Sequence, residues 1–543
     1  MMVVLLPLLM VEQGAAVTYF VAANGSDANS GMAQEVPWQT MAKVNASRFA
    51  PGDLILFRRG DAWAEKLVIS SSGTPENPIT FGAFGSGDGP VLDVKGIDAN
   101  VIAVYASNLT IQDFILKNSS NNALGISPKN GFSGKIMNLT IHNAGNNGIS
   151  LSSGGVGVVI DRCRIFNSAN NGVMLLGSLS NKLSRVVVRD CLVSKTTGND
   201  CFSVHEGEGG TAGEGFLFVN NHAEYCHEQG FDITSGEKVI LLENQTKGNV
   251  AGGITVAHSA SNVTVRRHLS REEPTMPTSA AISFTAGQNH RLYESVILDS
   301  GYHSLRVGAS NIYICNNTIR WGGSGEIMDV VGVIDGLVVK NNLFLSDRAD
   351  GGRIRFLDPS RPPGHPTFAL DNNLYHGPGG LRIFVKASDT QYDFDNYRTT
   401  SKQEVHGLAV DPGVINITGG DFHLRPESVA IDHGAFYTAT TRDGQGRVLP
   451  VVDAGYFVDG FGLIRGDLIQ VGVKAQSHTA TVLQVDYNRN ELTLDTELTW
   501  RQGDAVSLAY VGAAPDMGAF EHGGANPPWR LPAPVLHRVK LEQ

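Results

Sequence analysis

Two short stretches of the sequence place acidic and histidine side chains beside glycine turns. They read GNDCFSVHEG, from Gly198 to Gly207, and HEQGFDITSG, from His227 to Gly236. Each contains a short apolar segment of alternating pattern, which favours a strand. Carboxylates in such a cluster could bind a cation, and a histidine could act as a general base near neutral pH. This chemistry requires a fold that brings the two stretches together.

The two stretches belong to a series of similar segments. Aligned copies end at residues 151, 175, 204, 233 and 256, and further copies end near 284 and 307. Units this short cannot bury their own apolar face, whereas stacked units bury a continuous core. The pattern predicts an all-β fold, a right-handed parallel β-helix. A leucine-rich-repeat solenoid is the competing interpretation, but the leucine spacing differs and no helical segment recurs.

Stacking in this register predicts columns of side chains. One outward column is expected to hold Ser203, Asp232, Thr255, Ser283 and Arg306. The next column holds His205, and Asp200 and Glu228 lie in the turns just ahead. Because adjacent coils are about 4.8 Å apart, we expect Asp200, Glu228 and Asp232 to converge. Carboxylates that close require a cation or shared protons; the alternative is a solvated polar turn without function.

Paired asparagines recur at the turn after the first strand of a unit, at Asn220–Asn221, Asn316–Asn317, Asn341–Asn342 and Asn372–Asn373. Stacked asparagine amides can hydrogen-bond along a coil and satisfy the backbone groups of the turns. We therefore expect these pairs to be structural.

Both ends of the series resemble known β-helix proteins. The segment YFVAANGSDANSGMAQEVPWQTMAKV resembles the entry region of the pectate-lyase superfamily, where the Trp-x-Thr stretch begins a capping helix. The motifs DPGVINITGGDFHLRPESVAIDHG and APDMGAFEHG resemble closing segments of bacterial β-helix proteins. Between them, alternation and an NRNE turn predict a small antiparallel module. It is either a structural insert or a carbohydrate contact.

The repeat and its flanking motifs predict six parts of the chain. They are a possible signal-peptide remnant (1–16), an N-terminal cap with the first coils (17–100), the β-helix core (101–400), a closing segment (401–461), the small β module (462–512), and a closing motif with the tail (513–543).

The two opening stretches also resemble the calcium-binding turns of family 9 pectate lyases, A-D-G-F and D-D-G-W-D. The resemblance implies a Ca²⁺ site formed by Asp200, Glu228, Gln229 and Asp232, with Gln229 where the family has an Asp. That family takes the substrate proton with a Lys in a G-x-G-F-K turn. This chain has GGIT there, so Thr255 stands at the position of the base.

The resemblance implies β-elimination on a uronate polymer, with an acidic polysaccharide as the partner. The reaction needs a group that neutralises the uronate carboxylate and a base that removes the C5 proton. Ca²⁺ on Asp232 and its neighbours, or Arg306, could do the first. His258 is the preferred base and His205 the second. His227, Lys247, Tyr302 and His303 are the expected substrate-binding residues, and Lys247 and Tyr302 are also weaker candidates for the base.

Three other functions remain open. GNDCFSV resembles the G-D-D-C-I turn of polygalacturonases, with Asn199 in place of the first Asp, which would imply a hydrolase with paired acids. A C5-epimerase would share the proton abstraction. A surface protein could bind a glycan on the same columns without cleaving it.

Charge and hydropathy limit the partners. The formal net charge is −11 and no basic run occurs, which argues against nucleic-acid binding. Residues 1–11 are apolar but too few to span a bilayer, and they resemble a signal-peptide core followed by GAA. No other membrane span is expected. We predict a secreted or periplasmic protein, most simply a monomer.

Overall fold

The computed structural model describes residues 15–97, 99–207, 210–274, 276–331, 334–356, 368–385, 390–473 and 477–524. Most of the predicted signal segment (1–14) and most of the predicted tail (525–543) lie outside the described residues. The chain divides into two compact units, the first ending at Ala212 and the second beginning at Gly213. Among the described residues, no helix is long and apolar enough to cross a bilayer.

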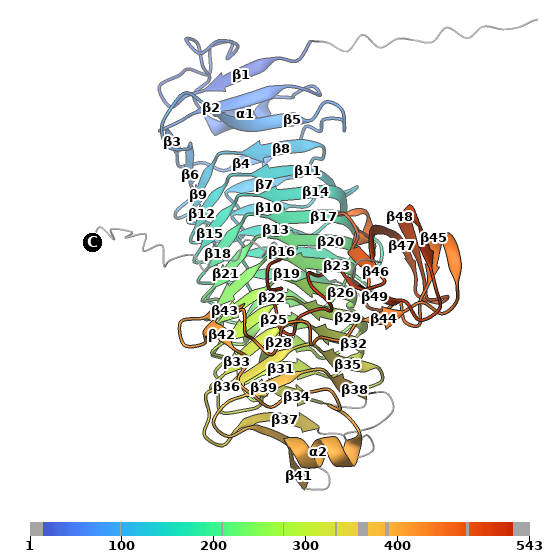
Figure 1. Ribbon diagram of the computed structural model, residues 1–543. Coiled ribbons are helices and arrows are strands. Elements are labelled where there is room, and N and C mark those ends of the chain that lie inside the picture. The colour runs from blue at the N-terminus through green and yellow to red at the C-terminus, as the bar shows by residue number, and fades with distance from the viewer. Residues whose placement is uncertain are drawn as a thin grey trace, which may run out of the picture. The chain divides into compact units, whose positions relative to one another are not determined.

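The first unit is a parallel β-helix with three faces (Figure 1). The first face consists of β1 (Thr18–Val21), β2 (Leu54–Arg58), β5 (Ile79–Phe84), β8 (Leu109–Gln112), β11 (Phe132–Met137), β14 (Gly155–Asp161) and β17 (Leu183–Arg189). The second consists of β3 (Ala62–Trp63), β6 (Val91–Asp93), β9 (Ile115–Lys117), β12 (Thr140–His142), β15 (Arg164–Phe166) and β18 (Leu192–Ser194). The third consists of β4 (Leu67–Ile69), β7 (Ile102–Val104), β10 (Leu124–Ile126), β13 (Ile149–Leu151), β16 (Val173–Gly177) and β19 (Phe202–Glu206).

A short helix, α1 (Met41–Ala46), lies in the N-terminal cap. Thr40 caps it by accepting a hydrogen bond from the Lys43 backbone N–H at 3.1 Å, and Met41 and Val44 are buried. The Trp38-Gln-Thr40 stretch thus precedes a helix, as the sequence predicts.

The second unit is also a coil with three faces of parallel strands. Its first face consists of β20 (Gly213–Val219), β23 (Glu237–Leu242), β26 (Ser261–Arg266), β29 (Gln288–Tyr293), β32 (Ser310–Cys315), β35 (Leu337–Lys340) and β38 (Phe368–Asp371). Its second consists of β21 (His222–Glu224), β24 (Gln245–Lys247), β27 (Leu269–Arg271), β30 (Val296–Leu298), β33 (Thr318–Trp321), β36 (Leu343–Ser346) and β39 (Leu374–His376). Its third, named the site sheet below, consists of β22 (Gln229–Ile233), β25 (Gly252–Val256), β28 (Ala280–Phe284), β31 (His303–Val307), β34 (Met328–Val330), β37 (Gly352–Phe356), β40 (Leu381–Val385) and the antiparallel β41 (Thr390–Asp393).

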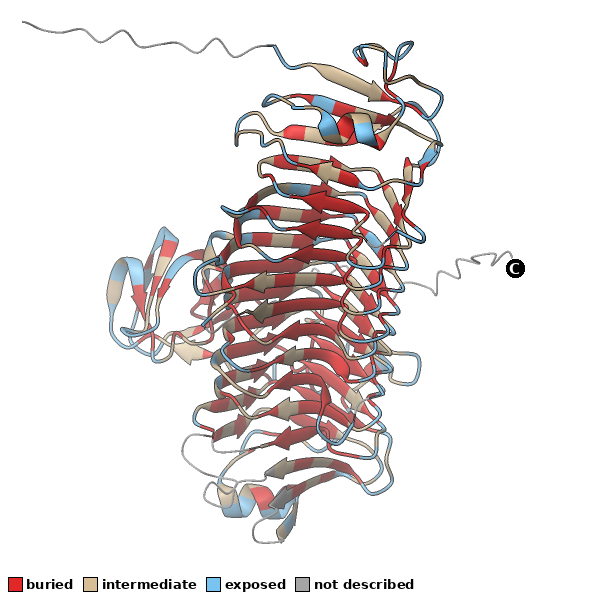
Figure 2. Ribbon diagram, turned by 180° about the vertical axis from the view of Figure 1, so that it is seen from behind, coloured by how far each residue is buried: buried red, intermediate tan, exposed pale blue. Residues whose placement is uncertain are grey.

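Strand alternation explains the core. Ile254 and Val256 on β25 are buried, whereas Thr255 between them is partly exposed. Figure 2 shows buried residues running along the stacked strands of each unit. Inward apolar residues from successive coils pack on one another, which confirms the predicted β-helix.

The asparagine pairs behave as predicted. The first member of a pair adopts a left-handed backbone, as at Asn316 (φ 54°) and Asn341 (φ 59°). The second forms a ladder along the coil: the backbone N–H of Asn317 donates to Asn342 Oδ1 at 3.0 Å, and that of Asn342 donates to Asn373 Oδ1 at 3.0 Å. The amides thereby satisfy buried turn groups that water cannot reach.

The chain after the coils closes the second unit. It contains α2 (Phe394–Ser401), the hairpin β42 (Val414–Asn416) and β43 (Asp421–Leu424), and an antiparallel sheet of β44 (Thr438–Ala439), β45 (Gly444–Pro450), β46 (Leu468–Val471), β47 (His478–Asp486), β48 (Glu491–Trp500) and β49 (Ala505–Leu508), with a short 3₁₀ turn at Gly460–Gly462. The predicted antiparallel module is confirmed, and its sheet also includes β44 and β45 from the segment before residue 462.

This antiparallel module packs on the first face of the second unit. The Tyr293 hydroxyl donates to the Tyr456 carbonyl at 2.9 Å, and the Arg291 guanidinium donates to the Gly455 carbonyl at 2.6 Å. Buried side chains of both parts form one apolar cluster that includes Cys315, Val482 and Trp500. The module therefore covers the first face and leaves the site sheet on a different side of the coil.

Candidate active site

A column of polar side chains follows the site sheet across six successive strands. The Cα register aligns, in order, Asp232, Thr255, Ser283, Arg306, Asp329 and Arg355. The sequence predicts the first four of these positions, and the structure places them in register. It extends the column to Asp329 and Arg355, which the sequence analysis missed. We call these six residues the site column.

The site column is too long for one reaction centre. Asp232 and Arg306 lie three strands apart, which corresponds to about 14 Å along the sheet. The predicted residues therefore separate into one group around Asp232 and another around Arg306.

The second group is the better defined. Asp329 on β34 is fully buried and lies between two arginines of the neighbouring strands. Arg306 Nη1 lies 3.2 Å from Asp329 Oδ2, and Arg355 Nε donates to Asp329 Oδ1 at 2.9 Å. The arginine side chains retain 18% and 22% of their exposure. A buried carboxylate thus holds two cations that still reach the surface.

A histidine and a glutamate lie beside this triad. His303 begins β31, three residues before Arg306, and Glu326 lies three residues before Asp329 on the next coil. The His303 ring Nδ1 is 2.9 Å from Glu326 Oε2 and also faces the Glu326 backbone N–H at 3.1 Å. The other ring nitrogen, Nε2, is 3.7 Å from Asp329 Oδ2. His303 therefore joins the two carboxylates. We call His303, Arg306, Glu326, Asp329 and Arg355 the Arg306 cluster.

The electrostatics of the Arg306 cluster favour the ionised form of Glu326. Burial raises the pKa of Glu326, but the hydrogen bond with His303 and the nearby Arg355 lower it by more, so the net shift is downward. Arg355 Nη2 lies 3.3 Å from Glu326 Oε2. Although burial acts against it, the bond to Asp329 raises the pKa of Arg355, and the nearby phenol of Tyr302 acts in the same direction.

Three buried polar atoms of the cluster contact the protein through ion pairs. They are Asp329 Oδ2, His303 Nε2 and Glu326 Oε2, and their contacts are 2.9 to 3.7 Å long. Buried polar atoms nearly always form hydrogen bonds with protein, water or ligand groups. These atoms could form hydrogen bonds with the hydroxyl groups of a bound molecule.

Tyr302 lies at the edge of the cluster. Its ring meets that of His303 edge to face, with centroids 4.5 Å apart, and its carbonyl accepts from Trp321 Nε1 at 2.8 Å. Tyr302 is only partly buried, so its phenol can meet a molecule bound on the site sheet. Of the predicted residues, the structure thus brings Tyr302, His303 and Arg306 together.

The group around Asp232 contains the other predicted residues of this sheet. Asp232 is 8% exposed on β22, which begins at Gln229, and Glu228 directly precedes that strand. His227 is exposed in the same turn, and His258 is exposed in the turn after β25 with a left-handed backbone (φ 46°). Because the strand of His258 lies two positions from that of Arg306, about 10 Å separates their coils.

Lys247 requires a correction. It lies on β24, in the second face of the coil rather than in the site sheet. Its ammonium group is 3.4 Å from Glu272 and 5.8 Å from the centroid of the Tyr225 ring. These contacts lie on the second face of the coil, outside the site column.

Asp200 and His205 belong to the first unit. Asp200 is fully buried in the turn before β19, where it takes the next position of an amide ladder. Its backbone N–H donates to Asn171 Oδ1 at 3.3 Å, and its Oδ2 lies 3.1 Å from Ser203 Oγ. The ladder reaches it through Asn100, Asn122, Asn147 and Asn171. His205 is partly buried on β19, in register with Leu176.

The calcium site stays a prediction. Asp200 lies in the first unit, whereas Glu228, Gln229 and Asp232 lie in the second. The latter three provide two carboxylates and one amide oxygen, and such hard oxygen donors suit Ca²⁺. The residues present therefore fit the ion in their chemistry.

Comparison with known proteins identifies the repeat. Residues 19–262 match the family model "Pel9A-like, right handed beta helix region". A lacto-N-biosidase of Bifidobacterium longum is 36% identical over 87 residues, which is 15% of this chain and 5% of that protein. Among solved structures, a GH136 lacto-N-biosidase of Eubacterium ramulus is 14% identical, with a TM-score of 0.41 and coverage of 68% of this chain and 67% of that one. Pectate lyase Pel9A is also 14% identical, with a TM-score of 0.39 and coverage of 94% and 98%. Residues 19–262 thus form a Pel9A-like, right-handed β-helix region, as the sequence predicts.

Proposed function

We propose that this protein is a carbohydrate-active enzyme, and specifically a polysaccharide lyase that cleaves a uronic-acid polymer by β-elimination on the site sheet. The observation that carries the proposal is the Arg306 cluster, in which two partly exposed arginines share one buried carboxylate. The Pel9A-like region adds support at the level of the family. A polymeric substrate also implies action outside the cytoplasm, and a monomer suffices because the cluster comes from one chain.

The arginines supply the first requirement of the reaction. A uronate carboxylate must be neutralised before the C5 proton becomes acidic enough to leave. Arg306 and Arg355 keep exposed edges on the site sheet, and each can donate to a carboxylate oxygen. Asp329 holds the two guanidinium groups in place, so little rearrangement is needed when the substrate binds.

Tyr302 supplies the second requirement. Its ring meets that of His303 in the Arg306 cluster, and the residue is partly exposed. Tyrosine can act as a general base or acid when it is positioned at the reacting atom. In the proposed step the phenolate oxygen takes the C5 proton, the C4–O4 bond breaks, and a C4–C5 double bond forms. The phenol then returns the proton to O4 of the leaving sugar.

His303 and Glu326 are positioning residues in this scheme. His303 is fully buried, so it acts through the groups that it contacts rather than on the substrate. Its contacts with Glu326 and Asp329 fix both carboxylates. We propose that His258 and His227 contact the polymer further along the site sheet.

Glu228, Gln229 and Asp232 are the residues of this unit that would hold Ca²⁺. A bound ion would supply positive charge for a second uronate carboxylate. Asp232 shares its column with Arg306, so the two positions would bind different sugars of one chain.

A glycoside hydrolase is the second candidate function. Glu326 and Asp329 form a carboxylate pair, and 87 residues match a lacto-N-biosidase at 36% identity. The lowered pKa of Glu326 disfavours it as a general acid, because a proton donor needs a raised pKa. A C5-epimerase would use the same proton abstraction, and a surface glycan-binding protein would use the column without a reaction.

The test is incubation with polygalacturonate and with alginate, followed by the ultraviolet absorbance of unsaturated uronate products. We expect absorbance to rise with at least one polymer and the R306A variant to abolish the rise. R320A is the matched control, because Arg320 is also an ion-paired arginine, 17% exposed, but lies on the second face. Equal loss in both variants, or no absorbance with any polyuronate, would contradict the proposal.

A further inference from the structure

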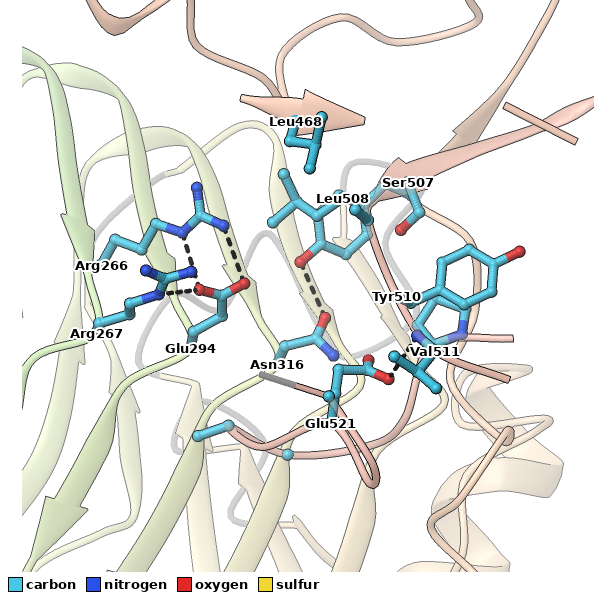
Figure 3. Close-up of a pocket in the computed structure, with 16 residues that line it drawn as sticks. Arg266, Arg267, Glu294, Asn316, Leu468, Ser507, Leu508, Tyr510, Val511 and Glu521 are labelled. Carbon is cyan, nitrogen blue, oxygen red and sulfur yellow. Dashed lines mark hydrogen bonds and ion pairs between the residues drawn. The ribbon is translucent and has the colours of Figure 1, made fainter. Parts of the chain in front are cut away.

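The second unit has a cavity on the side that carries the antiparallel module. It has a volume of about 320 Å³ and lies between the first face of the coil, the end of β49 and the closing segment (Figure 3). Small-molecule sites occupy about 300 to 1,000 Å³ and often lie at junctions between domains. The size and the place are therefore those of a site for a small ligand.

The wall on the coil side is a closed ion-pair network. Glu294 accepts from Arg266 at 2.9 and 3.0 Å and from Arg267 Nε at 2.9 Å. Arg266 also donates to Asp467 at 2.9 Å, and Arg267 to Glu243 at 3.3 Å. Burial raises the pKa of Glu294, but the two arginines lower it to about 2. Both guanidinium groups are thus committed to protein carboxylates.

The opposite wall is acidic but uncharged near neutral pH. Burial, assisted by the nearby Asp516, raises the pKa of Glu521 to about 8. Its oxygens accept from the Asp516 backbone N–H at 3.0 Å and from the Val511 backbone N–H at 3.5 Å. A protonated carboxyl also has a proton to donate, so Glu521 can exchange hydrogen bonds with hydroxyl groups.

The rest of the lining is mixed. Leu468 and Val511 are 48% and 47% exposed, and Tyr510 and Ser507 extend the same wall. Exposed leucine and valine at a concave site offer apolar contact, while Ser507 and Glu521 offer hydrogen bonds. A pyranose ring has this same combination of C–H faces and hydroxyl groups.

We propose that the cavity binds a neutral sugar unit, at a site separate from the site sheet. An acidic sugar is disfavoured because Arg266 and Arg267 are already paired with Glu294, Asp467 and Glu243. The choice of a sugar rests on the proposed carbohydrate-active function, but binding here does not depend on catalysis. The site would retain a neutral part of a mixed polymer while the site sheet contacts its uronates.

The experiment is isothermal titration calorimetry of the full chain with galactose, N-acetylglucosamine and galacturonate. We expect at least one neutral sugar to bind, and the L468A and E521Q variants to weaken that binding at least fivefold. L483A is the matched control, since Leu483 is 55% exposed on β47 and does not line the cavity. Its binding should equal that of the parent protein.

Three outcomes would overturn the proposal: no neutral sugar binds, galacturonate binds more tightly than both neutral sugars, or L468A and E521Q bind like the parent. Circular dichroism of each variant shows whether it has folded, and L468A tests the site if E521Q does not fold. R306A distinguishes this proposal from the lyase: it should lose cleavage but keep neutral-sugar binding. A protein that binds the sugar but never cleaves would contradict only the lyase.

Discussion

Arg355 and Asp329 occupy one register position on neighbouring strands, and Arg355 Nε donates to Asp329 Oδ1 at 2.9 Å. Arg306 contacts the same carboxylate from the other side. One buried acid therefore determines where two surface-reaching cations lie.

Replacing that acid should affect both stability and activity. Removing one partner of a buried ion pair costs about 3 to 5 kcal/mol, so D329N should unfold at clearly lower denaturant concentration. Misplaced arginines should also reduce cleavage roughly 100-fold. Urea unfolding and initial rates measure both effects. D347N is the control, because Asp347 pairs with Arg320 at an exposed position and should cost under about 1 kcal/mol.

Tyr302 should be essential to the reaction and dispensable for the fold. Y302F keeps the ring contact with His303 and removes only the hydroxyl group. Loss of a general base should lower kcat by roughly 10²- to 10⁴-fold, with the unfolding midpoint unchanged. H258A should retain most activity, because its coil lies about 10 Å from that of Arg306. If H258A is inactive and Y302F is not, the reaction takes place near Asp232 instead.

Calcium should stabilise the protein through Asp232. A ligand that binds only the folded state adds about 2.7 kcal/mol at a concentration of 100 times Kd. We expect Ca²⁺ to raise Tm, EDTA to reverse the rise, and D232N to remove it. D299N should keep the full response, since Asp299 is an exposed acid on another face. An equal Tm with and without Ca²⁺ would show that these residues do not bind the ion.

The buried acid Glu273 predicts a pH dependence of stability. Burial raises its pKa to about 8, although hydrogen bonds from Thr246 and Asn249 act in the opposite direction. Because the folded-state pKa exceeds the unfolded one, the contribution of this group is full below the unfolded pKa of about 4.3. It is lost as the pH rises to about 8.

The E273Q variant tests that dependence. Glutamine can still accept from the Asn249 backbone N–H, which donates to Glu273 at 2.6 Å. The variant should therefore lose less stability than the parent between pH 5 and pH 8, measured by urea unfolding across that range. E272Q is the control, because the Glu272 side chain is 57% exposed. Parallel stability curves for E273Q and the parent would refute the raised pKa.

The coil and its columns could be predicted because each repeat carries its own turn residues and its own alternating strand pattern. Glycine turns set the register, so Asp232, Thr255, Ser283 and Arg306 could be aligned without coordinates. The asparagine ladder follows for the same reason, since paired amides mark the turns. The copies that the sequence aligns end near residue 307, so Asp329 and Arg355 lie beyond the last of them.

The direction of a side chain at a corner of the coil could not be predicted. The sequence places Ser203 in an outward column, yet Ser203 is fully buried and its hydroxyl donates to Asp200 Oδ2 at 3.1 Å. The turn residues of a coil can point either way, because the strand alternation is interrupted there. Glu326 also lies in a turn, three residues before Asp329, and the sequence alone does not show on which side of the coil its side chain lies. A column of inward amides that ends in an acid is the signal that could have located Asp200.

The most direct test of the central claim is the ratio of unsaturated ends to new reducing ends when the protein cleaves a polyuronate. β-Elimination makes one unsaturated end for each reducing end, so we predict a ratio of one for the parent protein. R306A should form neither kind of end. Reducing ends without unsaturated ends would contradict the lyase and indicate a hydrolase.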